Sequence, residues 1–470
     1  MTGLVAVILL SGFLAALRLF SNISFSDPLQ LITSGSEEQS FLSLWNFIHG
    51  LPVYKDPQKI PFTFSYLNWL FYAFYGTVLK GILSITKLSE AWIPTLGRLI
   101  TLGFAVLGVG IAKRILHFLI PSPPPKLKPL FFLIPFYLFF GPLPAFWPLT
   151  TRPDIAAVIF ELLAFYVFIK NFPQNPLRAA FFAALLTFAA WSFKQSNVTV
   201  FLSLLIFCLS RNHRAAACLG FMMIFLCGIV VGLAGPEYRA STLFGFSGPG
   251  ISLMIGAENL FYYLAEYALA IPAYFALVTR QRRRDPVSQL LWITVLVTFF
   301  YGGITAHKVG ASENYFIPAS LFAAFFWMMY PEINSRLLYF SLSVNALLIF
   351  VIFFGIKGEV SKRYEHQQIL ALSQCTATLS KSLFSQTVYL NLPWMHRGEP
   401  FIPGYTYWAE KNRRERYEKG GIEGLIDEGY FASLLLEKSR KTEIRASFEK
   451  YTEQPSSCSA THVVLTRNSP

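Results

Sequence analysis

The chain has 470 residues, of which 54% are apolar, 17% aromatic and 14% charged, and its mean hydropathy is +0.47. About a quarter of the residues in a water-soluble domain carry charge, so this composition excludes an ordinary soluble protein. It also excludes a disordered chain, because 47 Phe, 22 Tyr and 9 Trp side chains cannot remain in water. The composition therefore predicts a protein that has a lipid bilayer as part of its solvent.

The net charge is +13, from 39 Lys and Arg against 26 Asp and Glu, and most of the excess lies in the apolar part of the chain. Residues 1–356 hold 23 basic and 13 acidic side chains, whereas residues 357–470 hold 16 and 13. Nucleic-acid binding requires basic side chains gathered on one folded surface. Here they separate hydrophobic runs, as topology signals do, so the pattern argues against a nucleic-acid partner.

Eleven apolar runs suit a bilayer crossing, which takes about 20 residues with tolerance for short and broken helices. They are Leu4–Phe20, Leu96–Arg114, Pro129–Leu149, Ile155–Lys170, Ala179–Phe193, Val198–Ser210, Ala215–Ala234, Leu260–Thr279, Val287–Ala306, Tyr315–Tyr330 and Leu337–Ile356. The sequence therefore predicts an all-α polytopic membrane protein with about 11 transmembrane helices. The first run lacks a basic N-terminal region and a cleavage site, so we interpret it as an uncleaved span rather than a signal peptide.

A further apolar run, Phe62–Leu83, is left out of this count because of the charges around it. If this run does not cross the membrane, 13 basic residues lie in short connections on one side of the membrane, and nine lie in longer connections on the other side. The positive-inside rule places the dense set in the cytoplasm. The run is rich in Tyr, Trp and Phe, as expected for an interfacial helix, and Glu38–His49 has the apolar spacing of a second one.

This topology divides the chain into a transmembrane domain, residues 1–356, with an exterior loop at 21–96, and an exterior soluble domain, residues 357–470. In the second domain TVYLNL (387–392), a helix-like stretch at Tyr407–Lys419, YFASLLLEK (430–438) and HVVLTR (462–467) alternate between strand and helix patterns. The alternation predicts a small α/β layer. Cys375 and Cys458 are its only cysteines, and an oxidising exterior leaves it open whether they form a disulfide.

Two acidic residues of the first exterior loop, Glu37 and Glu38, precede the first interfacial helix. A carboxylate at this place can take a proton from an acceptor hydroxyl near the lipid surface, as a general base does. The alternative is structural, because acids at a helix N-terminus, here after Ser36, complement the helix dipole.

A second set of ionisable residues begins the fourth span in TRPDIAAVIFE, residues 151–161. Arg152 and Asp154 lie at its exterior mouth, and Glu161 follows two turns deeper on the same helix face. An acid within a span normally faces a cavity and is a candidate functional residue. The alternative is an Arg–Asp pair that caps a helix.

The remaining candidates for substrate binding lie in short exterior connections. Lys194 and Gln195 join two spans, and a lysine there can pair with a phosphate or extend harmlessly to the interface. The other candidates are Arg239 in the second exterior loop and His307, Lys308, Asn314 and Tyr315 in AHKVGASENYF. Several exterior cations beside a few carboxylates indicate an anionic, membrane-anchored substrate.

The order of these motifs resembles that of the GT-C glycosyltransferases, in the branch that holds aminoarabinose transferase, protein O-mannosyltransferases and the rhizobial lipopolysaccharide sugar transferases. The similar pieces are GSEE, HGLPVYKDP, LGRLITLG, TRPDIAAVIFE, SFKQSN and HKVGASENYF, which span residues 35–316. Many members have Asp-Glu in the first loop, where this chain has Glu37-Glu38. The resemblance implies that one of these two residues is the catalytic base.

The resemblance also implies a function: an integral membrane glycosyltransferase that moves a sugar from a polyprenyl-phosphate donor to a glycan, lipid or protein acceptor. It implies an inverting reaction on the exterior face of the plasma (inner) membrane, in the cell envelope. We expect no cofactor and no metal, because the seven His residues are dispersed. The alternative is a transporter or flippase of lipid-linked saccharides, although such proteins usually contain a repeat, and none is found here.

Overall fold

The computed structural model of the chain describes most of its helical part and a C-terminal sheet. The described residues are 5–13, 16, 37–63, 65–125, 128–144, 146–244, 250–267, 269, 273–274, 285–308, 311–329, 340, 343–348, 351, 371–374, 376, 379, 382–386, 390, 392–394, 417–439, 441–454 and 461–468. Cys375 and Cys458 lie outside these residues, as do most residues of the predicted span Leu337–Ile356.

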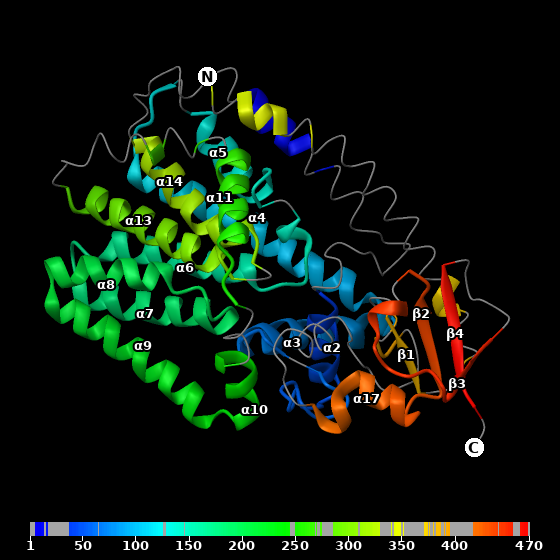
Figure 1. Cartoon of the computed structure of the whole chain (residues 1–470). Coiled ribbons are helices and arrows are strands. Elements are labelled where there is room, and N and C mark those ends of the chain that lie inside the picture. Colours follow the sequence, from blue (N-terminus) through cyan, green and yellow to red (C-terminus); the bar gives the residue numbers. More distant parts are fainter. Residues whose placement is uncertain are drawn as a thin grey trace.

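Five helices that run side by side form the main bundle (Figure 1). They are α6 (Asp154–Asn171), α7 (Pro176–Phe193), α8 (Thr199–Arg211), α9 (His213–Leu233) and α13 (Pro286–Ala306). The starts of α7, α9 and α13 follow from local capping chemistry: Asn175, Asn212 and Asp285 each accept a hydrogen bond from a backbone N–H of the first turn. Helix α7 buries Ala179, Ala180, Ala183 and Ala184, and such small side chains let neighbouring helices approach closely.

Further helices of the apolar part pack against this bundle or against one another. They are α4 (Ile93–Leu119), α5 (Leu130–Phe140), α10 (Pro236–Tyr238), α11 (Leu253–Glu266) and α14 (Ile317–Met329). Short 3-10 turns precede two of them and one helix of the main bundle: η1 (Glu90–Trp92) lies before α4, η5 (Glu313–Phe316) before α14, and η3 (Trp147–Leu149) before α6. The π-helical segment η4 (Arg239–Phe244) follows α10.

Five of the described helices are long and apolar enough to cross a membrane. They are Trp69–Thr86, Glu90–Leu119, Pro176–Phe193, His213–Leu233 and Pro286–Ala306. Leu130–Phe140 and Thr199–Arg211 are shorter apolar helices. The architecture is thus compatible with a helical membrane protein, and the count of eleven crossings stays a prediction.

The predicted span Pro129–Leu149 is wrong as a single helix. Helix α5 ends at Phe140, and the chain then turns before η3. The sequence after Phe140 is GPLP, in which Gly141 takes an extended conformation and two prolines cannot continue a helix. This apolar segment therefore contains one short helix and an irregular connection.

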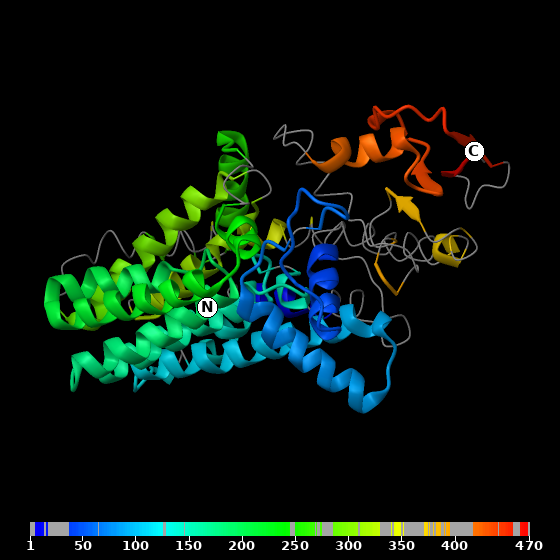
Figure 2. The ribbon, with the colours of Figure 1, turned by 90° about the horizontal axis from the view of Figure 1, so that it is seen from below.

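Helices α2 (Glu38–Ile48) and α3 (Trp69–Thr86) lie together at the end of the bundle that faces the C-terminal sheet (Figure 2). The helix predicted at Glu38–His49 is confirmed. In the run Phe62–Leu83, the described residues before Trp69 are irregular and the helix continues to Thr86. Helix α3 has the length and apolarity of a membrane span, so its interfacial orientation stays a prediction.

The C-terminal part contains a four-stranded sheet of order β1-β2-β4-β3. Strands β1 (Leu383–Ser385) and β2 (Ser433–Glu437) are parallel, whereas β2 with β4 (His462–Arg467) and β4 with β3 (Tyr451–Glu453) are antiparallel. Helix α17 (Gly421–Glu428) and the turns η6 (Glu418–Gly420) and η7 (Lys441–Glu443) complete the described part of this α/β layer.

Two of the strand predictions are confirmed, within YFASLLLEK and HVVLTR. The strand expected at 387–392 is wrong in position, because β1 ends at Ser385 and the described residues Leu390 and Leu392 lie outside strands. Most of the helix expected at Tyr407–Lys419 falls outside the described residues, and the described helix begins at Gly421, after that range.

Candidate functional site

The site is built around two buried ion pairs that link the starts of helices α2, α4 and α6. The first joins Glu37 to Arg98 of α4: Arg98 Nη2 lies 2.9 Å from Glu37 Oε2, and Arg98 Nε lies 3.4 Å from Oε1. The backbone N–H of Thr151 donates to Oε1 at 2.6 Å. The exposed fractions of the Glu37 and Arg98 side chains are 0% and 1%, so this carboxylate is held by charge and hydrogen bonds away from bulk water.

Gly97 explains how Thr151 comes so close to α4. A Cβ at Gly97 would lie only 2.6 Å from the Thr151 side chain. Glycine is therefore needed beside Arg98 for the close approach of the two backbones. Glu38, the second of the two acidic residues predicted from the sequence, begins α2 and its side chain is buried as well.

The second ion pair joins Asp154, at the start of α6, to Lys194, which directly follows α7. Lys194 Nζ lies 2.5 Å from Asp154 Oδ1, and Asn314 Nδ2 donates to the same oxygen at 2.6 Å. The other oxygen, Oδ2, lies 3.6 Å from Arg152 Nε and accepts no hydrogen bond within the described part of the chain. Asp154 is therefore a buried carboxylate with two cations beside it and one oxygen still able to accept.

Aromatic rings surround the cations of this cluster. The Arg152 guanidinium lies 5.6 Å from the Tyr66 ring centroid and 5.3 Å from that of Trp147, and Arg152 Nη1 donates to the Tyr66 hydroxyl at 3.0 Å. Lys194 Nζ lies 4.6 Å from the centroid of Tyr315. Burial raises the pKa of the Tyr66 phenol, although Arg152 opposes this shift, so the phenol stays neutral at physiological pH. These cation–π contacts stabilise charges that have little access to water.

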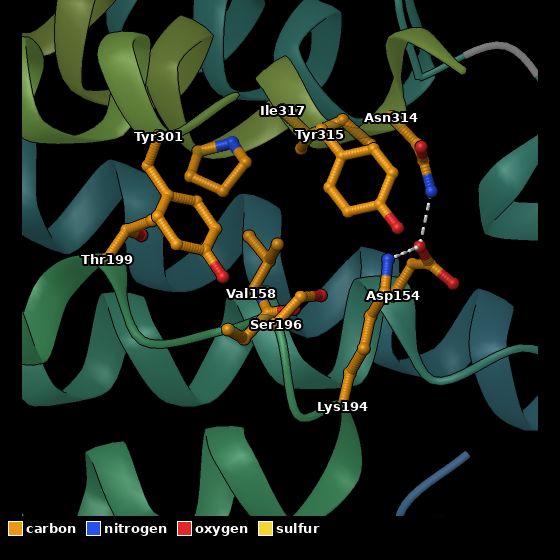
Figure 3. Close-up of a pocket in the computed structure, with 11 residues that line it drawn as sticks. Asp154, Val158, Lys194, Ser196, Thr199, Tyr301, Asn314, Tyr315 and Ile317 are labelled. Carbon is orange, nitrogen blue, oxygen red and sulfur yellow. Dashed lines mark hydrogen bonds and ion pairs between the residues drawn. The ribbon is translucent and has the colours of Figure 1, made fainter. Parts of the chain in front are cut away.

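A pocket opens beside the second ion pair (Figure 3). Its empty volume, counted with its mouth, is about 340 Å³. Tyr301 of α13 and Tyr315 of η5 point into it, opposite Asp154 and Lys194, which the dashed lines of Figure 3 connect. The remaining described lining residues are Val158, Ser196, Asn197, Thr199, Asn314, Ile317 and Pro318. The pocket thus combines an ion pair, two phenols and amides with apolar side chains.

Glu161 lies two turns below Asp154 on α6 and performs a different task. Its Oε1 accepts hydrogen bonds from the Thr199 N–H at 3.0 Å, the Thr199 hydroxyl at 2.8 Å and the Val200 N–H at 3.2 Å. Its Oε2 accepts from Asn197 Nδ2 at 3.2 Å. The carboxylate therefore caps the N-terminus of α8 from a neighbouring helix, where the helix dipole favours negative charge.

Of the other predicted substrate-binding residues, some lie close to the Asp154 cluster and others lie away from it. Gln195 Nε2 donates to the Tyr66 carbonyl at 2.7 Å, so Gln195 fixes the loop that presents Tyr66. Arg239 and Lys308 are exposed, and the His307 ring packs against Gly256 of α11. Within the described residues, these three side chains form no hydrogen bond or ion pair with the Asp154 cluster.

Arg98, Tyr66 and Tyr301 belong to the site but were not predicted from the sequence. Arg98 carried a usable signal: a charged residue inside an apolar run normally faces the protein interior and pairs there. Tyr66 and Tyr301 carried none, since tyrosines are frequent throughout the chain. The described residues also contain no group of three His, Cys, Asp or Glu side chains that could hold a metal ion.

Comparisons with known proteins identify no relative. Neither the models of known protein families nor the curated proteins contain a match to this chain.

Proposed function

We propose that the chain is an integral membrane glycosyltransferase that moves a sugar from a polyprenyl-phosphate donor to an acceptor hydroxyl. The proposal includes the eleven-span topology, a location in the plasma (inner) membrane, and an active site and C-terminal domain on the exterior side. It combines the motif order of residues 35–316 with the chemistry of the buried charge cluster.

The observation that carries the proposal is the arrangement of cations at the pocket. Lys194 pairs with Asp154 in the pocket wall, and Arg152 lies beside the second oxygen of Asp154. The phosphodiester of a polyprenyl-phosphate sugar carries a single negative charge, and Lys194 lies in the wall of the pocket where such a group can pair with it.

The proposed reaction is one inverting displacement. A carboxylate takes the proton of the acceptor hydroxyl while the oxygen of that hydroxyl forms a bond to the anomeric carbon. The bond between the anomeric carbon and the phosphate oxygen breaks, and its electron pair leaves with the lipid phosphate. Cations placed beside the departing phosphate stabilise the charge that develops there, and this kind of electrostatic stabilisation is a large part of catalysis.

Three carboxylates are candidates for the base. The sequence resemblance favours Glu37 or Glu38, and the pocket favours Asp154. A general base must reach the proton that it removes. Asp154 lines the pocket, whereas both oxygens of Glu37 accept from Arg98, and one of them also accepts from Thr151. Because these donors occupy both oxygens, Glu37 acts as a base only if a bound substrate rearranges this pair.

The decisive experiment supplies purified protein in nanodiscs with a panel of polyprenyl-phosphate sugars and follows the release of the lipid phosphate. Wild type is compared with Glu37→Gln, Glu38→Gln and Asp154→Asn, and the folded fraction of each variant is measured by size-exclusion chromatography and thermal unfolding. Loss of turnover in one folded variant identifies the base. Wild-type turnover in all three variants would contradict the proposed acid–base chemistry.

The same preparation tests the alternative function. Reconstituted vesicles that carry a labelled donor report its movement between leaflets. Movement of the donor without any sugar transfer would replace the glycosyltransferase proposal with that of a lipid-linked saccharide flippase.

A further inference from the structure

The loop between α2 and α3 is attached to the C-terminal sheet layer by its residues 58–62. The backbone N–H of Glu418 donates to the Gln58 carbonyl at 2.9 Å, and the Ile60 N–H donates to Glu418 Oε2 at 3.1 Å. Two residues 358 positions apart in the sequence are thereby joined. The reciprocal hydrogen bonds fix the register between this loop and the start of the described C-terminal part.

Phe62 inserts its ring into the hydrophobic core of the C-terminal layer. The side chain is 1% exposed and belongs to the same buried cluster as Phe384, Ile422 and Leu425. Its ring meets that of Tyr417 edge to face, with the centroids 5.4 Å apart. Phe62 thus joins a core whose other described buried members are residues 384–465, and Ile60 of the same loop packs against it.

The backbone of Phe62 supports the same conclusion. Its φ is +57°, in the left-handed region that a bulky side chain rarely adopts. Such a conformation costs free energy and persists only where the surroundings impose it. Here the surroundings are the C-terminal cluster around the ring.

Four residues after Phe62, the same loop reaches the charge cluster. The Tyr66 hydroxyl accepts from Arg152, and the Tyr66 carbonyl accepts from Gln195. The neighbouring positions are fixed as well: the Ser65 hydroxyl donates to the Val53 carbonyl at 2.6 Å, and Asn68 Nδ2 donates to the Trp191 carbonyl at 2.7 Å. The Phe62 contact is therefore only four residues from Tyr66, and the described residues Ser65 and Tyr66 between Phe62 and Arg152 are held by hydrogen bonds.

We propose that the C-terminal domain serves as a clamp that holds the first loop in place, with Phe62 as the positioning residue that transmits this hold to Tyr66 and Arg152. Phe62 is not among the described residues that line the pocket, and it acts on them through the loop. The C-terminal domain thereby gains a definite role: it orders one wall of the charge cluster from outside the helical bundle.

The test is hydrogen–deuterium exchange of the full-length chain in nanodiscs, read at residues 63–68 and at strands β2 and β4. We expect Phe62→Ala to speed exchange at 63–68 by about tenfold or more, since the loop then opens without unfolding the rest. Phe62→Leu keeps an apolar side chain in the C-terminal core, so residues 63–68 retain most of their protection from exchange. The matched control is Leu51→Ala, a half-exposed apolar residue of the same loop, which leaves exchange at 63–68 at the wild-type rate.

A second variant keeps the test decisive if Phe62→Ala unfolds the sheet and speeds exchange in β2 and β4 too. Glu418→Ala removes the acceptor of the Ile60 N–H and leaves the core intact, so it loosens 63–68 alone, by about threefold. Unchanged exchange at 63–68 in both Phe62→Ala and Glu418→Ala would overturn the clamp. The exchange measurement does not depend on the proposed function. If the protein also transfers a sugar as proposed, Phe62→Ala raises the KM for the donor more than it lowers kcat.

Discussion

Arg98 and Glu37 form an ion pair in which Nη2 lies 2.9 Å from Oε2 and both side chains are almost completely buried. Removing one partner of such a pair leaves an uncompensated charge away from water, which costs about 3–5 kcal/mol. The pair therefore makes a large contribution to the position of α2, whatever its role in chemistry.

We expect Glu37→Gln and Arg98→Gln each to lower the free energy of unfolding by about 3 kcal/mol. The double variant Glu37→Gln/Arg98→Gln loses less than the sum of the two, because neither charge is then left alone. Thermal or denaturant unfolding in detergent, arranged as a double-mutant cycle, measures the coupling. Strictly additive losses would show that the two side chains do not interact in solution.

Lys194 is the cation that pairs with Asp154 and lines the pocket. If its role is to stabilise the departing phosphate, Lys194→Met lowers the turnover of a polyprenyl-phosphate sugar by about 10²-fold, and Lys194→Arg, which keeps the charge, lowers it less. The release of lipid phosphate measures this difference. The control is Lys80→Met, on the exposed face of α3. Lys194→Met with full turnover would remove Lys194 from the mechanism.

Glu161 supports α8 through four hydrogen bonds, three of them to Oε1. A glutamine can keep the three bonds to Oε1, so Glu161→Gln costs about 1 kcal/mol, whereas Glu161→Ala leaves two buried N–H groups unpaired and costs about 2–4 kcal/mol. Thermal unfolding of both variants checks this order. Equal stability of Glu161→Ala and wild type would show that water or another group replaces the cap.

Gly76 and Gly81 lie on the same helix, α3, but in different surroundings. A Cβ at Gly76 would lie 2.3 Å from the Phe47 ring of α2, whereas a Cβ at Gly81 meets nothing within 4 Å. Gly76→Ala therefore destabilises the protein by about 1–3 kcal/mol through overpacking. Gly81→Ala stabilises the helix by about 0.5–1 kcal/mol. The two melting temperatures, measured side by side, should move in opposite directions from that of wild type.

His462 begins β4 opposite Glu437 of β2. Burial lowers the pKa of His462, and Glu437 only partly offsets this shift. The folded state thus binds the proton less well than the unfolded chain, so the stability contribution is complete above about pH 6.5 and is lost as the pH falls through the lower folded pKa. The protection factor of the β4 amides, which corrects for the intrinsic pH dependence of exchange, should fall in wild type as the pH is lowered from 7 to 5. In His462→Gln this pH dependence should be weaker, and an identical dependence would exclude His462 as its source.

The sequence predicted the main bundle well because its helices carry strong local signals. Predicted and observed ends agree within three residues for α6, α7, α8, α9 and α13. Several of these helices start at an Asn or Asp cap, and two have proline in the first turn. Period and capping are properties of a short window, so one sequence is sufficient to find them.

The pairing of charges could not be predicted in the same way. Asp154 and Lys194 were both candidates, but 40 residues separate them, and only the packing of α6 against α7 brings them together. Glu161 and Asp154 look alike in the sequence, since each is an acidic residue at or within an apolar run. In the structure Glu161 caps helix α8, whereas Asp154 lines the pocket. The single helix predicted for Pro129–Leu149 was wrong because hydropathy alone suggested one long span. The apolar residues continue to Leu149, but the GPLP sequence ends the helix at Phe140.

The distances along the chain between Glu37 and its partners also constrain biogenesis. Arg98 follows 61 residues later and Thr151 follows 114 residues later. A ribosome exposes Glu37 long before either partner has been synthesised, and an ionised carboxylate without partners stays hydrated. Glu37 can therefore pair only after α4 and the start of α6 have been synthesised, which makes the docking of α2 a late step in assembly.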